Sequence, residues 1–109
     1  MTKEKKKQKV GELILIGEVA KKLGIHEQTI RTYERDGLLK PFRSLKNTRY
    51  FSKQDITRIM IIITLTQEFG LNRSGVSLLF NLAKKHRVKD EDLLEFIEDQ
   101  ATLILGPRG

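Results

Sequence analysis

The sequence predicts a small, mainly α-helical fold that carries one β-hairpin. Two short helix patterns occupy residues 16–35 and are joined through a glycine, and a polar turn around Asn47 follows them. Longer apolar helix patterns fill the second half of the chain. Two short helices that meet at a tight turn containing glycine are typical of a helix-turn-helix, and 109 residues suit one such domain with a docking helix.

The first predicted helix lies in the stretch IGEVAKKLG. Its apolar stripe includes Val19 and Leu23, and Gly24 supplies a C-terminal stop. A second helix is expected from residue 27 to about residue 35, and Gly37 can adopt the left-handed conformation that ends it. The loop between the two helices is therefore only a few residues long.

A β-hairpin is predicted in the stretch LLKPFRSLKNTRYF, residues 38–51. Asn47 tolerates the positive φ that a tight turn needs. Three cations, Arg43, Lys46 and Arg49, are distributed around its tip. This places a basic loop directly after the second helix.

Two longer helices are expected next. Ser52 and Asp55 have the capping-box spacing at the start of a helix over residues 53–69. Asn72 can cap the following helix, in RSGVSLLFNLAKKH. Gly75 within that helix costs about 1 kcal/mol against alanine, so we expect a close helix approach to explain it.

The last predicted helix, DEDLLEFIEDQATLIL, carries a candidate dimerisation seam. Apolar residues recur there at spacings of three, four and three, the rhythm of a coiled coil. The seam residues are Leu94, Ile97, Ala101 and Ile104. The alternative is a C-terminal helix packed on its own domain. The predicted organisation is a disordered basic arm (1–10), a DNA-binding domain (11–86), and a dimerisation helix with a short tail (87–109).

Charge and composition narrow the class of function. Residues 1–53 carry 14 Lys and Arg against 6 Asp and Glu, whereas residues 54–109 carry 7 against 8. The basic first half indicates an anionic partner, with solubility as the alternative. There is no cysteine, and His26 and His86 lie far apart, so neither a metal site nor a cofactor is expected. Nothing pairs a nucleophile with a base, so we do not expect an enzyme.

The second helix carries the candidate DNA-reading surface. Ile30 and Tyr33 can face the core, which leaves its polar residues on the remaining surface. Gln can bond an adenine edge and Arg a guanine edge, so Gln28 and Arg31 are suited to base contacts. The full candidate set is Glu27, Gln28, Arg31, Thr32, Tyr33, Arg35, Arg43, Lys46 and Arg49. The alternative for an isolated helix is a solvated face on which Arg31 pairs with Glu27 and Arg35 with Glu34.

The stretch IGEVAKKLGIHEQTIRTYERDGLLKPFRSLKNTRYFSKQDITRI resembles the DNA-binding domain of the MerR family of bacterial transcription regulators. The single tyrosine in RTYE, the wing sequence NTRYFS and the downstream LTQEFGLNRSGV are similar to the heat-shock repressors of the HspR type within that family. The resemblance spans residues 16 to about 82.

The resemblance implies a winged helix-turn-helix that dimerises through its C-terminal helices and binds inverted repeats in double-stranded DNA. Gln28 and Arg31 would face the bases, with Glu27 and Thr32 beside them. Phosphate contacts would come from Tyr33, Arg43 and Arg49. It further implies a cytoplasmic, nucleoid-associated repressor of chaperone genes, with a DnaK-type chaperone as corepressor.

Two other functions stay open from the sequence. An architectural or excisionase-like factor would share the winged fold and bend DNA. A helical protein-interaction adaptor would instead use the second half of the chain.

Overall fold

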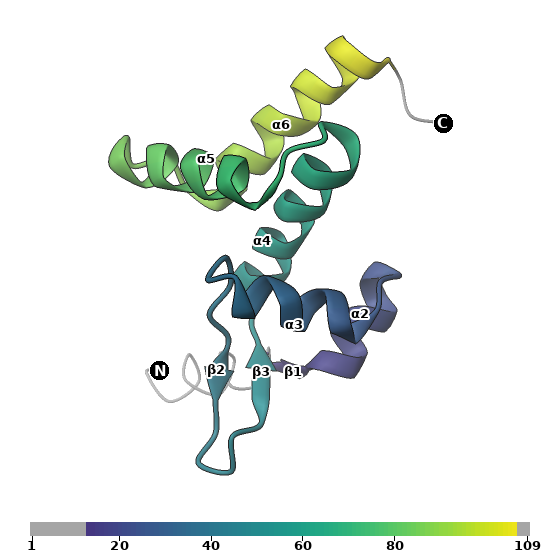
Figure 1. Ribbon diagram of the computed structural model, residues 1–109, viewed down its shortest axis with the longest axis vertical. Coiled ribbons are helices and arrows are strands. Elements are labelled where there is room, and N and C mark those ends of the chain that lie inside the picture. The colour runs from purple at the N-terminus through teal and green to yellow at the C-terminus, as the bar shows by residue number, and fades with distance from the viewer. Residues whose placement is uncertain (1–12, 107–109) are drawn as a thin grey trace, which may run out of the picture. The chain divides into compact units, whose positions relative to one another are not determined.

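The computed structural model describes residues 13–106 (Figure 1). The predicted basic arm, residues 1–10, lies outside the described residues. The chain divides into two compact units, one ending at Ile56 and the other beginning at Thr57. The mainly helical architecture with a small antiparallel sheet confirms the predicted winged helix-turn-helix fold.

The helix-turn-helix of the first unit consists of α2 (Ile16–Leu23) and α3 (Glu27–Arg35), which pack against each other (Figure 1). Gly24 ends α2 with φ 68°, and the next amide, that of Ile25, donates to the Ala20 carbonyl at 3.0 Å. This left-handed cap turns the chain within two residues, as the glycine predicted. The predicted bounds of α3 are confirmed.

A three-stranded antiparallel sheet holds the wing in the order β1-β3-β2 (Figure 1). Strands β2 (Phe42–Arg43) and β3 (Arg49–Phe51) form the predicted hairpin, and Asn47 has the positive φ expected of its turn. Strand β1 (Ile14–Leu15) pairs with β3, with Ile14 opposite Phe51. The sequence did not predict this strand or its pairing.

The core of the first unit explains how α3 is held. Val19 of α2, Ile30 of α3 and Phe51 of β3 are all completely buried. Leu38 and Leu39, just after α3, are buried as well. Because helix, strand and connecting loop are all buried in the same unit, the polar face of α3 is carried on a fixed support.

Helix α4 (Lys53–Ile63) begins with the predicted capping box. The Ser52 amide donates to Asp55 Oδ2 at 2.9 Å, and the Asp55 amide donates to Ser52 Oγ at 3.1 Å. The helix continues as a π-helical segment, η1 (Thr64–Glu68), which the sequence did not predict. The Thr66 hydroxyl donates to the Ile62 carbonyl at 2.8 Å, a back-bond known to distort helices.

The second unit contains α5 (Arg73–Lys85) and α6 (Asp90–Leu105). Asn72 caps α5 as predicted, accepting from the Gly75 amide at 2.9 Å. A Cβ at Gly75 would lie 3.3 Å from Leu71 Cγ, so the crowding comes from the residue before the cap. The expected approach of another helix at Gly75 was therefore wrong.

Arg58 connects three helices of the second unit. Its guanidinium carbon lies 3.8 Å from the centre of the Phe80 ring of α5, and its Nη1 bonds Asp90 Oδ2 of α6 at 3.1 Å. The cation is thus stacked and paired at once. Arg58 fixes the start of α6 beside α5.

Helix α6 turns part of the predicted dimerisation seam inward. Ile97 and Ala101 are buried within the chain, together with Leu93, while Leu94 is half-buried. Ile104 remains exposed. For its two central residues the seam therefore packs on the chain itself, the alternative that the sequence had left open.

A different apolar stripe of α6 faces solvent. Phe96 is 60% exposed and Leu103 is 77% exposed, seven positions apart and so on one side of the helix. Ile104 adjoins them with 65% exposure. None of the described helices is both long enough and apolar enough to cross a bilayer.

The turn between α2 and α3 gives a stability prediction. Replacing Gly24 by Ala should lower the free energy of unfolding by about 1–2 kcal/mol, because an L-residue is strained at φ 68°. No atom lies within 4 Å of the added Cβ, so strain alone is tested. Urea unfolding followed by circular dichroism measures the change.

Gly24→Asn is the matched control, since Asn tolerates the left-handed region and should cost less than Ala. Equal unfolding midpoints for wild type and Gly24→Ala would contradict this account of the turn.

Candidate nucleic-acid interface

Helix α3 separates a buried face from a polar face. Ile30 and the Tyr33 ring are buried as predicted, whereas Gln28 is exposed and Arg31 and Thr32 are half-exposed. The buried pair fixes the rotation of the helix about its axis. Any phosphate contact by Tyr33 is confined to the small part of its side chain that remains exposed.

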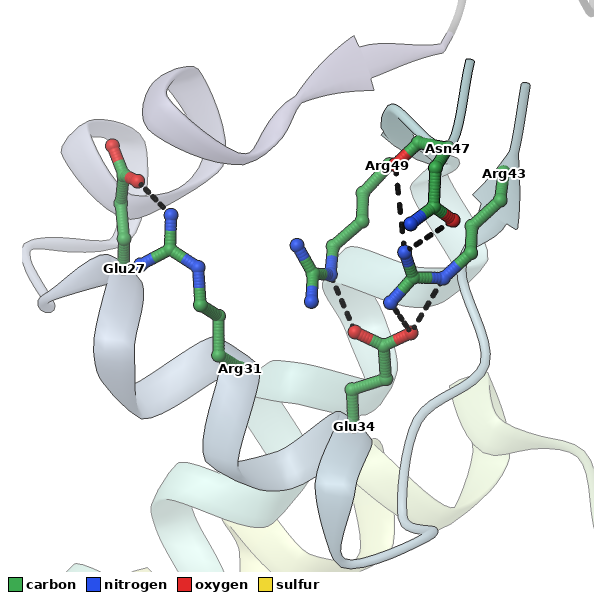
Figure 2. Close-up of polar contacts among 6 residues, drawn as sticks. All are labelled: Glu27, Arg31, Glu34, Arg43, Asn47 and Arg49. Carbon is green, nitrogen blue, oxygen red and sulfur yellow. Dashed lines mark hydrogen bonds and ion pairs between the residues drawn. The ribbon is translucent and has the colours of Figure 1, made fainter. Parts of the chain in front are cut away.

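The candidate base-contacting arginine is paired within α3. Arg31 Nη2 bonds Glu27 Oε1 at 2.9 Å, with side-chain exposures of 40% and 43% (Figure 2). An exposed i,i+4 pair contributes only about 0.3–0.5 kcal/mol. Arg31 can therefore exchange Glu27 for another acceptor at little cost.

The alternative of a solvated face had expected Arg35 to pair with Glu34, but Arg35 does not pair with it. Its Nη2 instead donates to Thr32 Oγ1 at 3.3 Å on the exposed surface. His26 occupies the N-cap position of α3, but its side chain makes no capping bond.

The wing turn is fixed by its own polar groups. Ser44 Oγ accepts from the amides of Lys46 and Thr48 at 3.2 and 3.1 Å, and the Asn47 amide donates to the Ser44 carbonyl at 2.8 Å. Lys46 is exposed at this turn, and Leu45 beside it is fully exposed. The tip therefore presents a cation on a well-determined backbone.

Glu34 joins α3 to both strands of the wing. Its Oε2 accepts from Arg43 Nη2 at 2.7 Å and from Arg43 Nε at 3.1 Å, while its Oε1 accepts from Arg49 Nε (Figure 2). Arg43 also donates from Nη1 to Asn47 Oδ1 at 2.8 Å. One carboxylate thus organises two arginines that lie opposite each other across the hairpin.

The ionisation of Glu34 follows from these contacts. Burial by itself raises the pKa of the carboxyl, but hydrogen bonds and charge from Arg49 and Arg43 outweigh it, so the pKa lies below the usual value. Glu34 is therefore ionised at neutral pH.

Sequence reasoning missed Glu34 as a site residue. Its partners lie 9 and 15 positions away, beyond any helical spacing. The available signal was an acid on a helix that is followed directly by a basic hairpin.

The helix and the wing enclose one cationic recess of about 430 Å³. It brings together five of the predicted contact residues with the one acid that the sequence had not singled out. The lining residues are Gln28, Arg31, Glu34, Arg35, Arg43 and Arg49. The lining thus includes four guanidinium groups and one carboxylate, which suits a polyanion with acceptors for the amide and arginine donors.

Comparison with known proteins places this geometry in a family. The MerR HTH family of regulatory proteins matches residues 15–83, which include the helix-turn-helix and the wing. The chain is 35% identical over 82 residues to the mercuric resistance operon regulatory protein of Bacillus cereus, covering 74% of this chain and 61% of that protein.

Two further relatives are similar. A Streptomyces coelicolor protein assigned as the heat shock protein HspR is 34% identical over 68 residues, which cover 62% of this chain and 45% of that protein. The HTH-type transcriptional regulator TnrA of Bacillus subtilis is 33% identical over 92 residues, covering 84% of this chain and 81% of TnrA. Since the family match covers more than half of its length, the chain belongs to the MerR family of helix-turn-helix regulatory proteins, a family of DNA-binding transcriptional regulators.

Proposed function

We propose that the chain is a dimeric repressor of heat-shock genes that binds an inverted repeat in double-stranded DNA. The observation that carries the DNA-binding part is the recess between α3 and the wing. Gln28 and Arg31, the candidate base contacts, line it together with further cations of α3 and the wing. This combination matches the division of labour in specific DNA complexes.

In this proposal α3 enters the major groove and the wing holds the flanking backbone. Gln28 and Arg31 bond base edges, for which Arg31 leaves Glu27. Arg35 and Lys46, both exposed, add cations toward the phosphates. The strong basic excess of the first half of the chain supports this docking face.

Dimerisation is proposed through the exposed stripe of α6 rather than through the whole predicted seam. Phe96, Leu103 and Ile104 form an apolar surface that a second copy can cover. A two-fold dimer presents two copies of α3, and this symmetry calls for an inverted repeat.

The heat-shock assignment is the finer part of the proposal. It is supported by the similarity to HspR. The similar mercuric resistance regulator suggests a different signal, but the 109 residues contain no cysteine to supply a thiolate for a soft metal. A DnaK-type chaperone as corepressor belongs to the same proposal.

The base-contact role of Arg31 is tested by substitution. Arg31→Ala should weaken binding to the preferred site by about 1–3 kcal/mol and relax preference at one base position per half-site. Selection from a randomised duplex pool, followed by competition titrations, measures both. Lys85→Ala, which removes an equal charge from an exposed position of the second unit, is the control.

An unchanged base preference in Arg31→Ala would contradict the reading role. If a variant that no longer binds DNA retained full biological activity, the protein-interaction adaptor would be favoured. Strong bending without promoter occlusion would favour the architectural factor.

The proposed dimer surface gives a second prediction. Leu103→Lys should weaken dimerisation at least about tenfold, because a charge placed in a small apolar interface costs at least about 1.4 kcal/mol. Sedimentation equilibrium measures the constant. Thr102→Lys, its exposed neighbour on another side of α6, should leave dimerisation near wild type. Equal effects of the two variants would remove α6 from the interface.

A further inference from the structure

We propose that Glu34 is a positioning residue that sets DNA specificity, by locking the wing arginines to the recognition helix and withholding positive charge from non-specific DNA. This inference rests on the DNA-binding function proposed above. It assigns the role to an acidic residue inside a cationic interface, where an acid by itself opposes DNA binding.

Glu34, Arg43 and Arg49 form a persistent cluster, hereafter the clamp. The Glu34 side chain is only 17% exposed, and those of Arg49 and Arg43 are 25% and 34% exposed. These groups are less exposed than the Glu27–Arg31 pair on the same helix. Screening by water and salt is weaker there, so the clamp outlasts the pair that Arg31 has to leave.

The clamp also determines how the wing is held against α3. Arg43 and Arg49 are direct cross-strand partners, and like charges at such positions repel each other. The Glu34 carboxylate lies between them and bonds the Nε of each (Figure 2). The wing is thereby fixed to the helix that carries Gln28 and Arg31.

Arg43 and Arg49 differ in the hydrogen-bond donors that remain for a phosphate. Arg43 uses Nε and Nη2 on Glu34 and Nη1 on Asn47. The terminal nitrogens of Arg49 make no such bond within the part of the chain that the structure describes. Arg49 therefore offers its two terminal amino groups to a phosphate, in an orientation set by its Nε bond, whereas Arg43 serves mainly as a brace.

The clamp has a consequence for the selectivity between specific and non-specific DNA. Two arginines and one carboxylate carry one net positive charge, which limits attraction to arbitrary phosphates. A wing coupled to α3 meets the backbone well only when α3 lies in its correct register. Two uncoupled arginines would hold phosphates in any register. Glu34 thus lowers non-specific affinity more than specific affinity.

Glu34→Gln provides the test. Two duplexes are compared in salt titrations of the full chain, one selected by the wild type from a randomised pool and one scrambled. On the scrambled duplex, the slope of log affinity against log salt should steepen by about 0.9 per protomer, and affinity near 0.15 M salt should rise roughly fivefold for each protomer that contacts the duplex. The ratio of specific to non-specific affinity should fall at least as much.

Two further variants separate charge from position. Glu95→Gln removes an exposed acid of α6 and should leave slope and ratio near wild type. Glu34→Asp keeps the charge but is one methylene too short to hold both arginines, so the slope should stay near wild type while the ratio falls. A wild-type ratio in Glu34→Asp would overturn the positioning role.

The outcomes distinguish this inference from the proposed function. If the wild type selects no duplex, the DNA-reading function fails regardless of Glu34. If it selects one and Glu34→Gln changes both affinities in equal proportion, Glu34 is merely structural and the inference fails alone. A fall in the ratio of specific to non-specific affinity, together with a steeper salt slope, supports the inference, whereas a rise in that ratio or an unchanged slope overturns it.

Discussion

The arrangement of α3 and the wing depends on the hydrogen bonds that the Glu34 carboxylate accepts from the two wing arginines. This carboxylate receives hydrogen bonds from both strands of the wing and belongs to the helix that presents Gln28 and Arg31. The apolar core beneath supports the same arrangement, because Ile30 of α3 and Phe51 of β3 are both completely buried. Helix and wing are therefore held together twice, by packing below and by charge above. A small domain needs both, since loop-borne contacts alone position side chains poorly.

The two acids of α3 differ in kind. Glu27 pairs with Arg31 at an exposed i,i+4 spacing, a contact weak enough to be exchanged for another acceptor. Glu34 engages partners 9 and 15 residues away in a less exposed setting, and these arginines lower its pKa. The weak pair leaves the Arg31 side chain available for other acceptors. The stronger contacts of Glu34 fix the wing to α3. This contrast explains how one short helix can be both rigid and adaptable.

Local chemistry made much of this predictable from sequence. Gly37 and Asn47 take the positive φ expected of them, and Ser52 and Asn72 cap the helices that they precede. These features depend on neighbours within a few residues. Features that depend on distant contacts were missed, namely the β1 pairing and the Glu34 clamp, and the inward side of α6 was left as an open alternative. The predicted seam on α6 was periodic, but periodicity cannot distinguish a face packed on the chain itself from one packed on a second copy.

Membership in the MerR family fixes the general function, while the signal and the target genes belong to the proposal. In the proposed function, two copies of α3 and its clamped wing recognise an inverted repeat. The most direct measurement is a DNase footprint of the full chain on the DNA upstream of its own gene and of chaperone genes. We expect protection of two symmetric half-sites whose centres lie on one face of the duplex, about one helical turn or a multiple of it apart. Uniform or absent protection at every concentration would contradict this proposal.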